Sequence, residues 1–195
     1  MLTETEIKRF LAMPGMTKGV VFQTDAEYIR KKFGEAGLAQ LEARVKELGV
    51  PIDYRKAKAM EWLPLGLRVI SLLAIKELFS LSNEDIKAMG NTAPKLSFLI
   101  KLLLKSFISI RATFAKAPEM WQRHYSIGRV FSDYHETDRC VAVTITGIEL
   151  PPIMVGYLEG YFQRIAQYSL GPNVRCDRDP SLEKGEVKHG FRVSW

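Results

Sequence analysis

The segment 151-PPIMVGYLEGYFQRIAQYSLGPNVRCDRDPSLEKGEVKHGFRVSW-195 decides the fold. Residues 153–165 have the composition of a helix, and two runs of strand character follow them. In the last run, 187–195, the odd positions are mostly apolar and the even ones polar or small, which is the period-two pattern of a half-buried strand. The run 173–177 alternates in the same way, and 180–185 has turn composition. The segment therefore predicts a helix followed by a β-hairpin.

Two further predictions follow from this hairpin. If its strands pair antiparallel, Cys176 and His189 fall roughly opposite each other on the inward face. The apolar parity of the last strand also places Trp195 in the core. The chain would then tolerate little trimming at its end.

Upstream of this segment the signals are first helical and then extended. Thr3 with Glu6, and Ser82 with Asp85, have the spacing of helix N-caps. We expect helices at residues 4–13, 25–49, 62–79, 82–90, 94–113 and 117–124, followed by strands at 129–134 and 141–145. Helices followed by strands predict an α+β fold, with N-terminal helices packed on an antiparallel sheet made of two hairpins separated by a helix.

Composition limits the class of protein. The 195 residues suit one domain, 1–195, and 47% hydrophobic with 26% charged residues is ordinary for a globular chain. The net charge of +6 suits an anionic partner, but the basic residues are scattered, which argues against nucleic acid. Two cysteines, Cys140 and Cys176, cannot form a disulfide framework, and no signal peptide is present, so we expect a cytoplasmic protein.

The most apolar stretch, residues 94–113, is open to two interpretations. Four basic residues interrupt it, so no run reaches the roughly 18 uncharged residues that a transmembrane segment needs. It can be a central core helix whose lysines reach outward. Alternatively, part of its surface lines a lipid-sized cavity or packs against a second copy of the chain.

No catalytic signature is found: phosphate-binding glycine loops, Gly-x-Ser-x-Gly elbows and Cys-x-x-Cys pairs are absent. Since no nucleophile–base pair can be named, we expect that the protein is not an enzyme. Cys176 and His189 are candidate metal ligands, because zinc binds thiolate and imidazole. A buried thiol beside a hydrogen-bonded histidine explains the same residues. Nearby acidic residues that could complete a zinc site are Asp177, Asp179, Glu183 and Glu186.

Polar groups gather where the helix 117–124 passes into the next strand. Tyr125, Ser126 and Arg129 could bind a carboxylate or phosphate through charge-assisted hydrogen bonds. They could equally bind carbonyl groups of the junction itself.

Several of these segments together resemble a known superfamily. They are residues 18–22, 81–90, Tyr125 with Gly128, the 156–160 helix and the ending 176–195. The pattern resembles the bacterial branch of the 4-vinyl-reductase-type and heme-nitric-oxide-binding-like ligand-binding superfamily, whose other members are similar in fold to small subunits of the Golgi vesicle-tethering complex. The resemblance implies a non-enzymatic, often dimeric α+β domain that encloses a hydrophobic pocket and signals its occupancy.

Two branches of this superfamily imply cofactors. Heme-binding members use an axial histidine well upstream of a Tyr-x-Ser-x-Arg motif. Here the serine of Tyr125-Ser126-Ile127-Gly128-Arg129 is displaced by one position and no histidine precedes His124, which argues against heme. Zinc-binding members carry a Glu-x-x-Cys, but Asn173 stands at the glutamate position and Leu158 at that of an upstream cysteine. We therefore expect no cofactor, with zinc at Cys176 and His189 left open.

The leading hypothesis is a sensory domain that binds a small apolar or acyl ligand and forms a homodimer. The alternative is a dimeric scaffold with a vestigial pocket. We expect the pocket between the helices 62–79 and 96–114. Candidate ligand-binding residues are Trp62, Leu72, Phe98, Leu102, Trp121, Tyr125 and Arg129.

Overall fold

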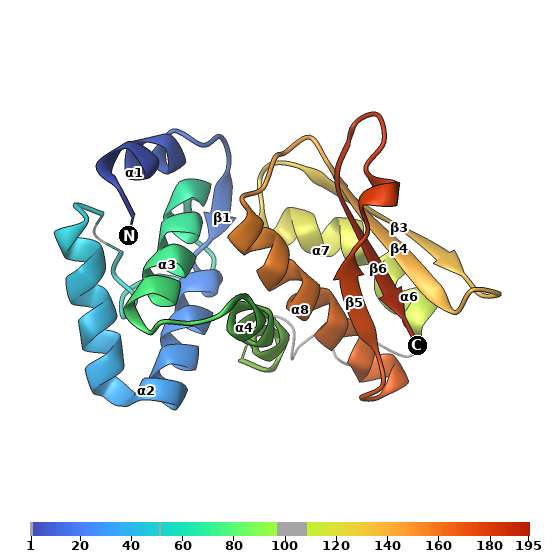
Figure 1. Ribbon diagram of the computed structural model, residues 1–195, viewed down its shortest axis with the longest axis horizontal. Coiled ribbons are helices and arrows are strands. Elements are labelled where there is room, and N and C mark those ends of the chain that lie inside the picture. Colours follow the sequence, from blue (N-terminus) through green and yellow to red (C-terminus); the bar gives the residue numbers. More distant parts are fainter. Residues whose placement is uncertain (1, 51, 97–108) are drawn as a thin grey trace.

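A computed structural model describes residues 2–50, 52–96 and 109–195 of the chain. The N-terminal half contains α1 (Glu4–Leu11), β1 (Met16–Lys18), α2 (Val20–Glu47), β2 (Trp62–Pro64), α3 (Leu65–Leu78) and α4 (Asn83–Leu96). The C-terminal half contains α6 (Ile110–Ala115), α7 (Ala117–His124), β3 (Arg129–His135), β4 (Cys140–Thr146), α8 (Pro152–Leu170), β5 (Arg175–Arg178), the short 3-10 helix η2 (Pro180–Leu182) and β6 (Val187–Ser194). Figure 1 shows the two halves side by side, with α4 and α8 where they meet.

The helix boundaries follow local chemistry. Thr3 and Glu6 form the predicted capping box at α1, since the Thr3 hydroxyl accepts from the Glu6 amide and the Glu6 carboxylate accepts from the Thr3 amide. Ser82 and Asp85 do the same at the start of α4. The long α2 bends at Gly34, whose φ of 72° is accessible mainly to glycine.

The four-stranded sheet has the order β3-β4-β6-β5 with every pair antiparallel. It therefore consists of two hairpins with α8 between them in the chain, which confirms the predicted α+β architecture. Ser132, Val143 and Phe191 are paired neighbours on one face. Ser132 donates to the Phe114 carbonyl of α6, and the Phe191 ring contacts Phe162 of α8 edge-on, so α6 and α8 cover the same face.

Two expectations about the C-terminal hairpin are corrected. Cys176 pairs with Val193, whereas His189 pairs with Ile145 of β4, so Cys176 and His189 are not opposite each other. The connection from β5 to β6 contains the 3-10 helix η2, so it is longer than a simple turn and the register of the two strands differs from the expected one. Trp195 is only partly buried, and its ring stacks on Tyr134 with centroids 6.1 Å apart.

Further boundaries differ from the sequence-based expectations. Residues 62–64 form a strand that pairs with β1, so the helix α3 begins only at Leu65. Pro94 lies inside α4 and does not start a helix. Most of the expected 94–113 helix, including Phe98 and Leu102, lies outside the described residues.

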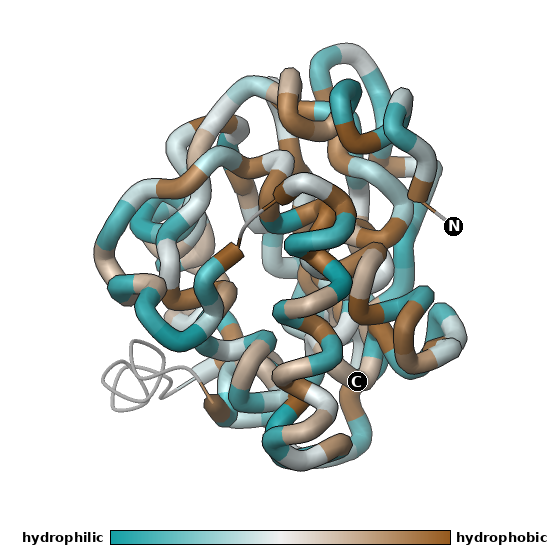
Figure 2. Tube along the Cα trace, turned by 90° about the vertical axis from the view of Figure 1, so that its left-hand side faces the viewer, coloured by the Kyte–Doolittle hydropathy of each residue, from teal (hydrophilic) through white to brown (hydrophobic). Residues whose placement is uncertain are grey.

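The core is continuous through both halves. Figure 2 shows hydrophobic and hydrophilic segments alternating along the tube, as amphipathic elements require. Buried apolar residues from α2, α3, α4, α8 and the sheet form one cluster. None of the described helices has the length and apolar character needed to cross a membrane.

Candidate ligand-binding site

An apolar cavity of about 80 Å³, here called the His124 cavity, lies where the start of α2 meets α6, α7, α8 and β3. Most of its wall consists of aliphatic and aromatic side chains, and its polar members come from threonine, tyrosine and histidine. The described lining residues are Val20, Val21, Thr24, Ala93, Thr113, Phe114, Ala117, Met120, Trp121, His124, Tyr125, Val130, Tyr157, Leu158, Tyr161, Phe162 and Ile165.

His124 is the group in this wall best suited to bind a metal. Its Nδ1 lies 2.8 Å from the Met120 carbonyl oxygen one turn earlier in α7. Because a carbonyl only accepts hydrogen bonds, Nδ1 carries the proton and Nε2 presents its lone pair. Burial lowers the pKa of His124, although the Met120 bond opposes this, so the ring is neutral at pH 7. Among the described residues, Nε2 has no hydrogen-bond partner.

Aromatic residues hold α7 in place beside the cavity. The Trp121 ring stacks on Tyr125 with centroids 4.3 Å apart, and its indole nitrogen donates to the Ile127 carbonyl at 2.9 Å. Burial raises the pKa of Tyr125, Tyr157 and Tyr161, so their hydroxyl groups stay protonated and uncharged. The wall is therefore uncharged where it surrounds the cavity.

A buried ion pair lies behind this wall. Arg68 of α3 donates to Asp25 of α2, which also accepts from the Ser71 hydroxyl at 2.9 Å. The Arg68 guanidinium lies over the Tyr157 ring, 4.5 Å from its centroid. Arg68 Nε and Nη2 and one Asp25 oxygen have no partner in the described part of the chain. The ion pair thus connects α2, α3 and a cavity residue of α8.

The structure brings together only some of the residues that the sequence suggested. Trp121 and Tyr125 line the cavity, whereas Trp62, Leu72 and Arg129 do not. Trp62 is 41% exposed on β2, under the Lys18 ammonium. Leu72 is fully buried in the core, and Arg129 is exposed at the start of β3. The described part of the cavity has no wall from α3, contrary to expectation.

His124 itself was missed as a candidate. The available signal was its spacing of four from Met120 and three from Trp121, which predicts one shared helix face. The superfamily pattern places the axial histidine upstream of this position, where the chain has none.

The proposed metal pair does not form. Cys176 is fully buried, burial raises the pKa of its thiol, and it faces Val193 across the sheet. His189 Nε2 instead accepts from the Leu150 amide at 2.8 Å. Within residues 2–50, 52–96 and 109–195, no group of three or more histidine, cysteine, aspartate or glutamate side chains could hold a metal ion.

Solved structures share this fold, although no protein-family model and no curated protein matches the chain. One is an oxygen-binding H-NOX domain related to soluble guanylate cyclases, with 12% identity, a TM-score of 0.63, and coverage of 91% of this chain and 94% of that one. Another is an H-NOX protein from S. oneidensis, with 12% identity, a TM-score of 0.66, and coverage of 91% and 95%. A third was solved to probe heme distortion in the H-NOX family, with 12% identity, a TM-score of 0.65, and coverage of 91% and 94%.

This comparison confirms the resemblance in fold and corrects one expectation. We expected no cofactor and argued against heme, but the structures that share the fold are H-NOX proteins studied for their heme. The expectation rested on the absence of a histidine before His124, and the fold is shared without one.

The side chains that line the cavity are chemically suited to heme, but the cavity is too small to hold it. His124 offers a neutral imidazole with a fixed tautomer, and apolar walls suit a porphyrin. Cofactor pockets usually measure about 300–1,000 Å³, so a cavity of about 80 Å³ has to widen before it admits one.

Proposed function

We propose that the chain is a sensory ligand-binding domain without catalytic activity of its own, and that its binding site is the His124 cavity. Heme is the cofactor that we assign to it, with His124 as the iron ligand. The observation that carries this assignment is the neutral His124 ring, whose Nδ1 is held by Met120 and whose Nε2 has no partner in the described part of the chain. The H-NOX fold supports the assignment independently.

Each part of the site has a defined task in this proposal. The Met120 carbonyl fixes the tautomer of His124 and raises the basicity of Nε2, as carbonyl partners of metal-binding histidines do. The stack of Trp121 on Tyr125 keeps α7 in register with the strand that follows. Apolar walls exclude water, and heme would supply an iron atom able to bind a diatomic gas.

The cavity volume favours a second candidate ligand. About 80 Å³ accommodates a diatomic gas or a small apolar molecule without any movement of the walls. A small apolar ligand would use the same residues, apart from metal binding by His124.

The test is reconstitution with hemin, followed by absorption spectroscopy of the oxidised and reduced protein. We expect wild-type protein to bind hemin with one histidine-ligated iron per chain. His124→Ala should change the spectrum and weaken binding at least about tenfold. The matched control is His135→Ala, because His135 lies on β3, is exposed and does not line the cavity.

Either of two results would contradict the assignment. A spectrum of His124→Ala identical to that of the wild type would show that another residue binds the iron. Wild-type protein that takes up no hemin, but binds a small apolar probe and excludes larger ones, would favour the second candidate.

A further inference from the structure

A second, polar pocket adjoins the His124 cavity. It measures about 550 Å³ and opens beside the first half of α2. Its described lining residues are Val20, Gln23, Thr24, Ala26, Glu27, Arg30, Lys31, Tyr54, Arg55 and Leu96. Val20 and Thr24 line both spaces, so this one turn of α2 is a common wall. The Thr24 hydroxyl donates to the Val20 carbonyl at 2.9 Å and leaves no unpaired hydroxyl hydrogen in that wall.

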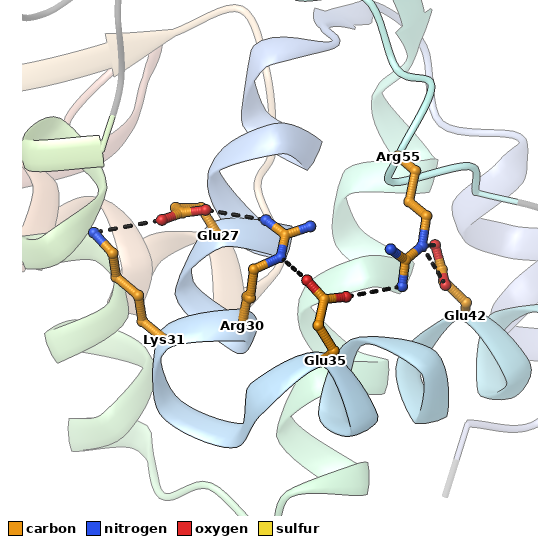
Figure 3. Close-up of polar contacts among 6 residues, drawn as sticks. All are labelled: Glu27, Arg30, Lys31, Glu35, Glu42 and Arg55. Carbon is orange, nitrogen blue, oxygen red and sulfur yellow. Dashed lines mark hydrogen bonds and ion pairs between the residues drawn. The ribbon is translucent and has the colours of Figure 1, made fainter.

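Figure 3 shows a chain of ion pairs, and four of its members, Glu27, Arg30, Lys31 and Arg55, line this pocket. This chain of ion pairs alternates in sign over six residues from the two segments of α2 and the loop after it. In order, the pairs are Lys31–Glu27 (3.5 Å), Glu27–Arg30 (3.0 Å), Arg30–Glu35 (2.5 Å), Glu35–Arg55 (3.1 Å) and Arg55–Glu42 (3.1 Å). Both members of each pair are within reach of solvent, so each pair contributes little to stability and is free to rearrange.

The charges are unevenly placed relative to the pocket. Of the six residues, the lining includes three cations but only one carboxylate, Glu27. Glu35 and Glu42 pair with the arginines from outside the lining. Hydrogen bonds to Glu35 and Glu42 raise the pKa of Arg30 and Arg55, so both stay charged. The lining itself therefore carries more positive than negative groups, and the carboxylates that balance its two arginines, Glu35 and Glu42, lie outside it.

We propose that this pocket, defined by Arg30, Lys31 and Arg55, binds the carboxylate end of a ligand whose apolar body occupies the His124 cavity once the walls of that cavity, including the shared turn at Val20 and Thr24, have moved apart. This inference rests on the proposed function, since it assumes that the His124 cavity is the ligand site. The ligand class is an amphipathic carboxylic acid, which includes both heme and fatty acids. Arginine suits this task because its planar donors match a carboxylate in two-point contact. Arg129 and Ser126 are not needed for it, as neither lines either space.

The experiment compares acids with their esters. Four probes are titrated against the whole chain by fluorescence quenching: hemin, its dimethyl ester, dodecanoate and methyl dodecanoate. We expect each acid to bind about tenfold more tightly than its ester, which corresponds to the sum of a few partly exposed charge contacts. Raising the ionic strength should reduce this preference. A preference seen only in the porphyrin pair identifies heme as the source of the carboxylate, and one seen only in the other pair identifies a fatty acid.

Variants locate the effect. Arg30→Gln/Arg55→Gln should abolish the preference for acids while leaving ester binding within about twofold of the wild type. The matched control is Arg178→Gln on β5, because Arg178 is 46% exposed, close to the 47% of Arg55, and pairs similarly with Glu183. Circular dichroism melting of all three proteins shows whether they fold alike, and the acid-to-ester ratio of the wild type needs no variant.

The outcomes separate this inference from the proposed function. Equal binding of acid and ester by the wild type would contradict the carboxylate site, as would an unchanged preference for acids in the double variant. Neither result would contradict ligand binding in the His124 cavity. Failure of all four probes to bind would overturn the heme assignment and the inference with it.

Discussion

His189 is buried and His124 is partly buried, and the hydrogen bonds that fix their rings run in opposite directions. His124 donates from Nδ1 to the Met120 carbonyl, whereas His189 accepts at Nε2 from the Leu150 amide. In the neutral ring of His189, the proton therefore sits on Nδ1, which has no partner among the described residues. Protonation of His189 would place a second hydrogen against the Leu150 amide. This contact just before α8 thus requires an uncharged ring.

Stability should therefore depend on pH in the mildly acidic range. Burial lowers the pKa of both His124 and His189 from the ordinary value of 6.5. Between the lowered pKa and 6.5, the unfolded chain binds protons that the folded chain does not. The free energy of unfolding should then fall as the pH drops below 6.5, by at most about 1.4 kcal/mol per pH unit for each histidine. Urea titrations between pH 7.5 and about pH 5 measure this slope.

The control is His189→Gln, whose side-chain oxygen can still accept from Leu150 but does not titrate. We expect it to reduce the slope that the wild type shows. Parallel slopes in both proteins would show that His189 does not contribute.

At the scale of elements, α4 and α8 cross at very short range. A Cβ added at Gly160 would lie 1.8 Å from the Lys87 carbonyl oxygen, and one added at Gly90 would lie 1.9 Å from the Tyr157 carbonyl oxygen. Backbone therefore meets backbone at this crossing, with no side chain between. Small residues allow such an approach, and a methyl group at either position forces the helices apart.

Gly160→Ala should destabilise the protein by about 1–3 kcal/mol, because overpacking outweighs the gain in helix propensity. The matched control in the same helix is Gly156→Ala, where nothing lies within 4 Å of the added Cβ. That change should stabilise the protein by up to about 1 kcal/mol. Thermal melts of the two variants should thus shift in opposite directions, and equal shifts would contradict the tight crossing.

Elements with a regular pattern were predictable from the sequence, and contacts between distant segments were not. The alternation in 187–195 predicted β6, and the spacing of Ser82 and Asp85 predicted the start of α4. The strands β1 and β2 have three residues each, too few to show a period, and they form because they pair with each other. The His124 cavity draws on residues from Val20 to Ile165, so no local pattern could define it.

At the scale of the whole molecule, the surface leaves several large apolar side chains exposed. They include Leu11, Met60, Trp62 and Phe131, between 41% and 58% exposed. Leu11, Met60 and Trp62 belong to the N-terminal half. Exposed apolar groups are common on monomers, so they do not by themselves define an interface.

We expect the chain to form a homodimer, as the resemblance to its superfamily implied. Native mass spectrometry and light scattering over a range of concentrations measure this directly. A concentration-dependent increase from one to two chains would support it. The mass of a single chain at every concentration would contradict the expected homodimer.

Tyr157 takes part in three of the features described above. Its ring lines the His124 cavity and lies under the Arg68 guanidinium, and its backbone carbonyl is the group that Gly90 meets. Because the backbones of α4 and α8 are in direct contact at this crossing, a shift of α8 here would displace α4. A ligand that displaces the Tyr157 ring would therefore move α4 as well. Under the proposed function, the residue that meets a ligand in the cavity would thus also be in direct contact with α4 of the N-terminal half.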